Sequence, residues 1–260
     1  MSRTAVLCLI TILSLQLQSA AAERTPFEER ARKIGGEEFR YMVLSPPKIE
    51  PGKKYPLVYF LHGAGERGDD PKKLLVHFPV QMAKPEWREK YPCFLVMPQC
   101  RSDKLWMNQH WSEKDFKTLD EEPNDQMEMA SAILDVWLKN PLIDMDRVYL
   151  TGLSMGGFGS WELAMRRPEL FAALAPVCGG GDESKADRIK DIPIWTAHGD
   201  ADRVVWPIRS RRMVEAVKKA GGDIKYTEYP GVGHNSWTRF YADPEGVVPW
   251  MFDQRRSNDR

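Results

Sequence analysis

A serine between two glycines is the feature of this sequence that most clearly could do chemistry. The pentapeptide Gly152-x-Ser154-x-Gly156 follows a short apolar and β-branched run, and a helical pattern over 160–165 comes after it. A serine hydroxyl becomes a useful nucleophile only when it is exposed and aimed at a base. A sharp turn between a strand and a helix achieves this, and small flanking residues permit the strained turn. We therefore expect Ser154 to act as the nucleophile of an acyl-transfer reaction.

Two backbone N–H groups could stabilise the oxyanion that forms when a serine attacks an acyl carbon. The helix after Ser154 would offer the N–H of Met155 at its positive dipole end. The buried run 56–61 leads into the glycine-rich segment 62–68, which could offer the N–H of Ala64. This segment lacks the Lys-Ser/Thr pair of a phosphate-binding loop. We expect His62, at the end of that run, to be structural.

The base and the acid are assigned by their order along the chain. Where a serine on such a turn works with a carboxylate and an imidazole, the order is nucleophile, acid, histidine. Of the histidines at 62, 77, 110, 198 and 234, only His234 follows the acidic pair Asp200 and Asp202. Either aspartate could hold the imidazole Nδ1–H and fix its tautomer. The residues alone favour neither of the two.

Strands and helices alternate around these residues. Strands are expected at 37–44, 56–61, 93–97, 147–151, 171–177, 193–197 and 224–229. Helices are expected at 71–80, from Asn124 or Asp125 onward, after the serine, at 207–220 and at 247–252. This alternation predicts an α/β fold with a mostly parallel sheet, helices on both faces and functional loops at the carboxyl ends of the strands. The segment between Cys178 and Ile192 is too short for a large cap domain.

The first 22 residues have the features of a secretory signal peptide. Arg3 provides the positive start, 5–17 the apolar core, and Ala20 to Ala22 the small-residue cleavage site. The apolar run is shorter than the ~20 residues that span a bilayer, and no later segment is apolar enough to do so. We expect export to the periplasm or the extracellular space, no stable membrane anchor, and Glu23 as the first mature residue.

The remaining 23–260 are expected to form a single catalytic α/β domain. Without the leader the chain has 36 basic and 37 acidic residues, a net charge of −1. Nucleic acid and anionic membranes are therefore not expected as partners, because both require clustered positive charge. The sequence leaves the oligomeric state open.

Three cysteines remain after the leader, namely Cys93, Cys100 and Cys178. The odd number leaves at least one thiol free, and the intervening strand holds Cys93 and Cys100 beyond disulfide reach. A bridge between Cys100 and Cys178 stays an alternative, but we expect buried free thiols. No metal-ligand spacing occurs, so neither a metal nor an organic cofactor is expected.

Taken together, the motifs resemble those of the α/β-hydrolase superfamily, and within it the small secreted esterases of the phospholipase/carboxylesterase or prolyl-oligopeptidase-like "predicted peptidase" type. The matching segments are 61–68, 146–157, 198–202 and 233–237. The resemblance implies a carboxylic ester hydrolase without a cofactor. It also implies that Asp202, the second aspartate of the His-Gly-x-x-Asp motif, is the acid, and that Asp200 forms the turn. The segment 204–207, with Trp206, departs from relatives, which often lack a large aromatic there; this bears on substrate size.

Four tryptophans stand in loops that the fold should gather around Ser154: Trp106, Trp111, Trp206 and Trp237. Each alone could simply pack beneath a long loop. Together they favour an open cleft with aromatic walls, suited to a small-molecule or polysaccharide-linked ester such as an acetyl or feruloyl sugar. The alternatives are a prolyl-oligopeptidase-like serine peptidase, a lipase or phospholipase-type esterase, and a non-catalytic binding module. A lactone hydrolase of this fold would usually have cysteine in place of Ser154.

Overall fold

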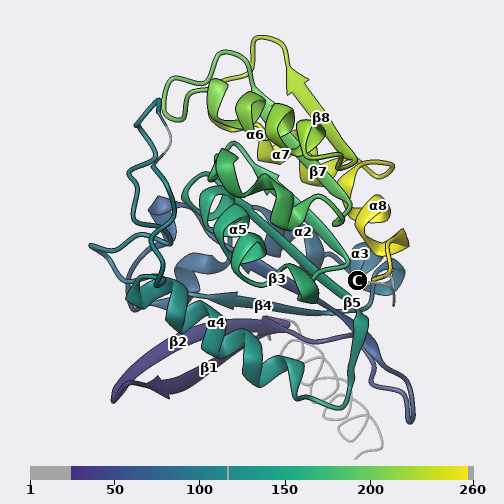
Figure 1. Cartoon of the computed structure of the whole chain (residues 1–260). Coiled ribbons are helices and arrows are strands. Elements are labelled where there is room, and N and C mark those ends of the chain that lie inside the picture. Colours follow the sequence, from purple (N-terminus) through teal and green to yellow (C-terminus); the bar gives the residue numbers. More distant parts are fainter. Residues whose placement is uncertain (1–24, 116, 257–260) are drawn as a thin grey trace, which may run out of the picture.

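A computed structural model describes residues 25–115 and 117–256, so the expected signal peptide at 1–22 lies outside the described residues. An eight-stranded sheet runs through the centre of the molecule (Figure 1). In spatial order its strands are β1 (Phe27–Ile34), β2 (Glu37–Leu44), β4 (Phe94–Pro98), β3 (Tyr55–Leu61), β5 (Ile143–Leu153), β6 (Ala173–Val177), β7 (Ile194–Gly199) and β8 (Ile224–Tyr229).

From β4 to β8 every neighbouring pair of strands is parallel, which confirms the prediction of a mostly parallel sheet. The antiparallel edge consists of β1 and β2, joined at Gly35 and Gly36, whose positive φ angles of 58° and 89° suit a tight turn. The sequence analysis did not predict β1. Its charged side chains lie on both faces of the strand, so the sequence lacks the alternation of apolar and polar residues that usually indicates a strand. On an exposed edge these charges also discourage pairing with another chain.

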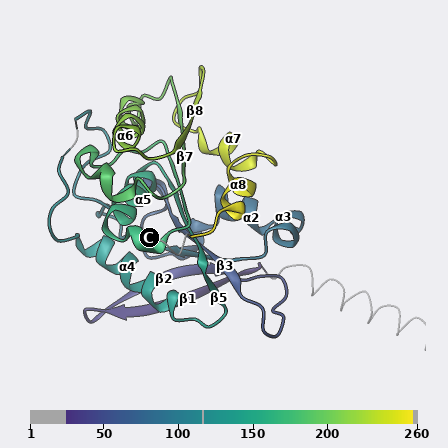
Figure 2. The same cartoon turned by 45° about the vertical axis from the view of Figure 1, so that its right-hand side comes forward.

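Helices cover both faces of the sheet, as predicted, and the turned view separates the two layers (Figure 2). One layer contains α4 (Asp125–Leu138), α5 (Met155–Arg166) and α6 (Ile208–Lys219); the other contains α2 (Phe78–Ala83), α3 (Pro85–Lys90), α7 (Trp237–Ala242) and α8 (Val247–Asp253). The connections between strands and helices contain short 3₁₀ helices: η1 (Ala64–Glu66), η2 (Pro71–Leu74), η3 (Pro168–Leu170) and η4 (Glu183–Ile189).

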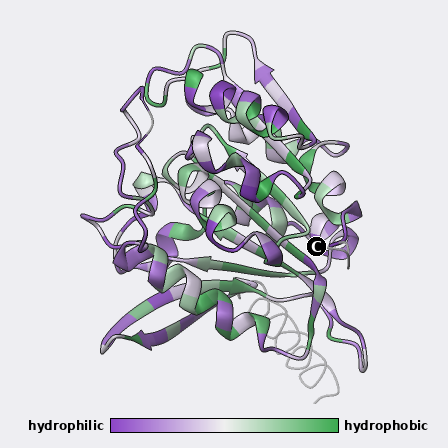
Figure 3. Ribbon diagram, in the orientation of Figure 1, coloured by the Kyte–Doolittle hydropathy of each residue, from purple (hydrophilic) through white to green (hydrophobic). Residues whose placement is uncertain are grey.

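The core therefore has two parts, one on each side of the sheet. Strand β3 shows how period-two alternation divides its side chains between them. Leu57 and Tyr59 pack with the α4–α5–α6 layer, whereas Val58 and Phe60 pack with the α2–α3–α7–α8 layer. All four are buried, and apolar residues line the centre of the molecule in the hydropathy view (Figure 3). The strands that precede the candidate functional loops are therefore packed against helices on both faces.

Local differences from the sequence predictions have physical causes. The single helix expected at 71–80 is divided into η2 and α2, because His77 has a φ of 55° that no helix accommodates. Helix α3 was not predicted. Of the two candidate caps of α4, Asn124 is the one that accepts the N–H of Met127, at 2.9 Å.

Cys93, Cys100 and Cys178 are buried and free, which confirms the expectation of free thiols at these positions. Within 25–115 and 117–256, no helix combines the length and apolar character needed to span a membrane.

Candidate active site

Ser154 occupies the sharp turn between β5 and α5. Its φ and ψ of 55° and −120° lie in a region that residues with side chains rarely adopt. A Cβ at Gly152 would clash with the backbone of Gly156, and one at Gly156 would clash with the backbone of Leu61. Glycine is thus required at both flanking positions by close backbone approach, and the turn aims the serine hydroxyl away from the sheet.

Three side chains from separate loops meet at this turn. The Nε2 of His234 lies 2.9 Å from the Oγ of Ser154, and its Nδ1 lies 2.7 Å from the Oδ2 of Asp202. Ser154 follows β5, Asp202 follows β7 and His234 follows β8, so all three lie beyond the carboxyl ends of parallel strands. The arrangement allows the imidazole to take a proton from the serine while the carboxylate fixes its tautomer.

The carboxylate of Asp202 is buried and accepts four hydrogen bonds. Its Oδ1 accepts the N–H groups of Val204 and Val205 at 2.8 and 3.0 Å. Its Oδ2 accepts from His234 and also lies 3.1 Å from the Nε2 of His198. Burial alone would raise the pKa of Asp202, but the hydrogen bonds from the two histidines outweigh it and hold the pKa far below its usual range. The group is therefore ionised at neutral pH.

Asp200, the competing acid candidate, points elsewhere. It is exposed, and its Oδ1 accepts the N–H of Gly231 at 2.7 Å, which ties the loop after β7 to the loop after β8. The residue types alone could not decide between the two aspartates. The geometry does so, because Asp202 is the one in contact with His234.

The two expected oxyanion donors flank the serine. Met155 is the first residue of α5, and Ala64 is the first residue of η1 in the loop after β3. N–H groups in the first turn of a helix have no partner within that helix, so both are free to donate to a developing oxyanion. Ala64 lines the same cleft as Ser154.

His62 is structural, as predicted. It is buried, its Nδ1–H donates to the carbonyl of Gly63 at 2.6 Å, and its Nε2 accepts the N–H of Cys100 at 3.0 Å. Burial lowers the pKa of His62 to about 4, so the imidazole is neutral at pH 7. The neutral ring of His62 therefore connects the start of the segment 62–68, here called the oxyanion loop, to the backbone just after β4.

Ser154 lines a cleft with a volume of about 230 Å³. Its lining consists of the triad residues Ser154 and His234, the oxyanion loop and, around them, Glu66, His77, Trp111, Leu153, Val204 and Trp237. Of the four tryptophans expected in the cleft, Trp111 and Trp237 are present. The ring of Trp237 meets that of His234 edge to face, with centroids 5.1 Å apart.

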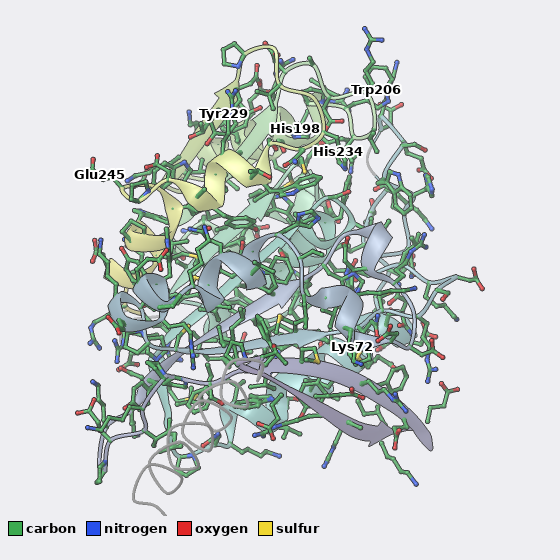
Figure 4. All side chains as sticks on the ribbon, turned by 180° about the vertical axis from the view of Figure 1, so that it is seen from behind. Lys72, His198, Trp206, Tyr229, His234 and Glu245 are labelled. Carbon is green, nitrogen blue, oxygen red and sulfur yellow. The ribbon has the colours of Figure 1, made fainter. Side chains whose placement is uncertain are left out.

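The predictions for Trp106 and Trp206 are wrong. Trp106 is fully buried; its Nε1–H donates to the carbonyl of His62 at 3.0 Å, and its Cβ packs against Gly159. Trp206 lies farther out at the same end of the molecule as His198 and His234 (Figure 4). Its ring is stacked with Lys114, whose Nζ is 4.1 Å from the centroid, and it does not line the cleft. Loop position alone did not indicate the direction of either side chain.

The sequence analysis assigned no role to His198 or His77, which both adjoin the site. His198 ends β7 immediately before Gly199, and its place in the His-Gly-x-x-Asp motif was the available signal. Glu66 lines the cleft and belongs to the matching segment 61–68, which was its available signal, whereas no motif marked His77.

Cys178, Asp202 and His234 place possible metal-ligating atoms within 4.8 Å of one another. Burial holds the pKa of the Cys178 thiol well above its usual value, so the thiolate that a metal requires is disfavoured. His234 and Asp202 already bond to each other. This donor set therefore fits a proton-transfer pair better than a metal site.

Fold and site together define an α/β-hydrolase of the serine hydrolase type. The phospholipase/carboxylesterase family model matches residues 47–245, and the chain belongs to this family of carboxylic ester hydrolases.

Known proteins with similar sequences or structures include esterases and a thioesterase. Acyl-protein thioesterase 1 of Neurospora crassa is 25% identical over 227 residues, which cover 74% of this chain and 85% of that protein. A solved thermostable esterase is 39% identical, with a TM-score of 0.78 over 89% of this chain; the match spans 64% of that chain, less than two thirds of its length. A ferulic acid esterase structure is 16% identical, with a TM-score of 0.64, over 87% of this chain and 97% of that one, a likeness of fold alone.

Proposed function

We propose that this protein is an exported serine esterase that cleaves carboxylic esters through an acyl-enzyme. Ser154 is the nucleophile, His234 the general base and acid, and Asp202 the residue that orients the imidazole and stabilises its charged form. The observation that carries the proposal is the continuous set of contacts from Ser154 Oγ through His234 to Asp202, at 2.9 and 2.7 Å.

The reaction has two halves. In the first, Ser154 Oγ bonds to the acyl carbon while His234 Nε2 takes its proton, and the N–H groups of Ala64 and Met155 hold the oxyanion. The C–O bond to the alcohol then breaks, and His234 passes its proton to the departing alcohol oxygen. In the second half, water attacks the acyl-enzyme in the same way and releases the acid. Loss of one oxyanion donor typically costs about 3 kcal/mol of transition-state stabilisation.

For the substrate we propose acetyl or aromatic-acyl esters of sugar-like alcohols. Support comes from the indoles of Trp111 and Trp237 in the cleft, because flat aromatic faces suit a ring better than a long flexible chain. Because Trp106 and Trp206 lie outside the cleft, two of the four expected tryptophans line it.

A panel of esters tests the proposal. Purified protein is assayed with acetylated xylan, a feruloyl ester, a dodecanoyl ester and an aminoacyl anilide, each alongside Ser154→Ala. Hydrolysis of the first two, abolished by Ser154→Ala, is the expected result. Higher kcat/KM on the dodecanoyl ester would favour a lipase, and cleavage of the anilide alone would favour a peptidase.

A further inference from the structure

The backbone at His77 adopts nearly the same unusual conformation as that at Ser154. The φ and ψ angles are 55° and −124° at His77, and 55° and −120° at Ser154. In the described part of the chain only one other non-glycine residue, Cys178, has a positive φ. Strained backbone of this kind persists where the surroundings enforce it, and it concentrates at functional sites. The turn before α5 explains the strain at Ser154, whereas the triad does not explain the strain at His77.

His77 stands in the wall of the cleft that contains Ser154. Its ring meets that of Trp237 edge to face, with centroids 5.3 Å apart, and Trp237 meets His234 in the same manner. The strained turn therefore aims the imidazole into the cleft on the side of His234. About one third of the side chain, 32%, is exposed there.

The carboxylate of Glu66 faces His77 across a short gap. His77 Nε2 and Glu66 Oε1 are 3.9 Å apart, which is beyond hydrogen-bond distance. An oxygen placed to one side of the line that joins these two atoms would lie about 2.8 Å from each, within hydrogen-bond distance of both. The other carboxylate oxygen is 4.0 Å from the Nδ1 of His62, whose proton is already donated to Gly63. Glu66 thus offers an acceptor and His77 a ring nitrogen to the same point in the cleft.

The proton path identifies which part of the substrate reaches this gap. His234 returns its proton to the departing alcohol oxygen, so the alcohol must lie on the histidine side of the cleft. That side is the one lined by Trp237 and His77. A hydroxyl group carries both a donor and acceptor lone pairs, and it complements a carboxylate together with an imidazole.

We propose that His77 and Glu66 form a hydroxyl-binding subsite for the alcohol part of the substrate. Esters of polyols and sugars would then be preferred over esters of plain alcohols with the same acyl group. The inference rests on the proposed esterase function and specifies its alcohol.

Glycerol 1-acetate and propyl acetate test the subsite, because they differ only in two hydroxyl groups. We expect kcat/KM to be about tenfold higher for glycerol 1-acetate, mainly through a lower KM, as one hydrogen bond to a charged group can supply. His77→Gly removes the ring and adopts the same backbone without strain, so it should fold and bring the ratio near one. His77→Gln keeps a donor and should restore part of the preference.

Val80→Ala is the control, because Val80 is exposed on α2, the helix that begins directly after His77, and lies outside the cleft. Its ratio should equal that of the unaltered protein. A ratio near one in the unaltered protein, or one that His77→Gly leaves unchanged, overturns the proposal.

Binding separates this inference from the esterase function. Calorimetric titration of Ser154→Ala with both acetates should give a Kd about tenfold lower for glycerol 1-acetate, and Ser154→Ala/His77→Gly should lose that difference. If the unaltered protein hydrolyses neither acetate nor any ester of the panel, the esterase proposal fails and these Kd values alone decide the subsite. Equal Kd values for the two acetates would refute it.

Discussion

His198 donates from Nε2 to the same carboxylate oxygen of Asp202 that contacts His234, at a distance of 3.1 Å. The carbonyl of Val205 lies 3.0 Å from the same nitrogen, so both neighbours of His198 Nε2 are acceptors and the proton is on that atom. Both His198 and Asp202 are buried. The acid of the triad is therefore held by a second histidine, beneath the one that faces the serine.

We expect His198→Leu to lower kcat on a simple ester about tenfold with little change in KM. The substitution removes one of four hydrogen bonds that keep Asp202 ionised and oriented, and a bond to a charged group contributes about 1.5–3 kcal/mol. Ser210→Ala, which removes the contact on the other ring nitrogen, should have a smaller effect. An unchanged kcat in folded His198→Leu protein would contradict this positioning role.

Asp202→Asn should reduce kcat by several orders of magnitude. An amide would favour the wrong tautomer of the histidine, and the corresponding change in a serine protease lowers kcat ~10⁴-fold. Asp200→Asn is the matched control, because Asp200 only accepts the N–H of Gly231 and an asparagine oxygen can do the same. Steady-state kinetics of the two variants measure the difference. The reverse order of effects would transfer the acid role to Asp200.

Acidification should destabilise the protein through His62. Its pKa is about 4 in the folded state and about 6.5 when unfolded, so the unfolded chain binds the proton more readily. This contribution to the free energy of unfolding is complete above pH 6.5 and disappears as the pH falls from 6.5 to 4. Urea unfolding should show a loss of about 3 kcal/mol from this group over that range.

The matched variant for that measurement is His62→Gln, whose amide can donate to Gly63 and accept from Cys100 but does not titrate. Its free energy of unfolding should fall less steeply between pH 6.5 and 4, whatever its absolute value. Identical slopes for the two proteins would show that His62 is not the group responsible.

Expression of the full chain in a secreting host should yield a protein that begins at Glu23. The prediction follows from the positive start, apolar core and three alanines of residues 1–22. Intact-mass measurement of the exported protein would detect the cleavage. An uncleaved chain retained in the cytoplasm would contradict it.

The parts of the fold that follow from buried strands were predictable from the sequence. Apolar runs such as that of β3 and the glycines around Ser154 have only a few compatible local structures, and they gave the sheet and the serine turn. Strand β1 escaped prediction, because its pairing with β2, rather than an apolar pattern of its own, makes it a strand.

Chain order was enough to predict Ser154 and His234, the resemblance to the α/β-hydrolases selected Asp202 over Asp200, and the direction of the side chains in the loops could not be predicted. The order of Ser154, Asp202 and His234 corresponds to the contacts that the fold makes. Trp106 lies in the same long loop as Trp111, but its indole turns inward, where its Nε1–H donates to the carbonyl of His62 and its Cβ packs against Gly159, which has no side chain of its own. The positive φ angle of His77 depends on tertiary packing, and no local sequence pattern predicts it.

Covalent labelling of the nucleophile tests the central claim most directly. The protein is treated with a fluorophosphonate, which reacts with activated serine hydroxyls, and the modified peptide is located by tandem mass spectrometry. We expect a single adduct on Ser154, with labelling strongly slowed in His234→Ala because the base that activates the hydroxyl is lost. An adduct on another serine, or equally rapid labelling of Ser154 in His234→Ala, would contradict the account.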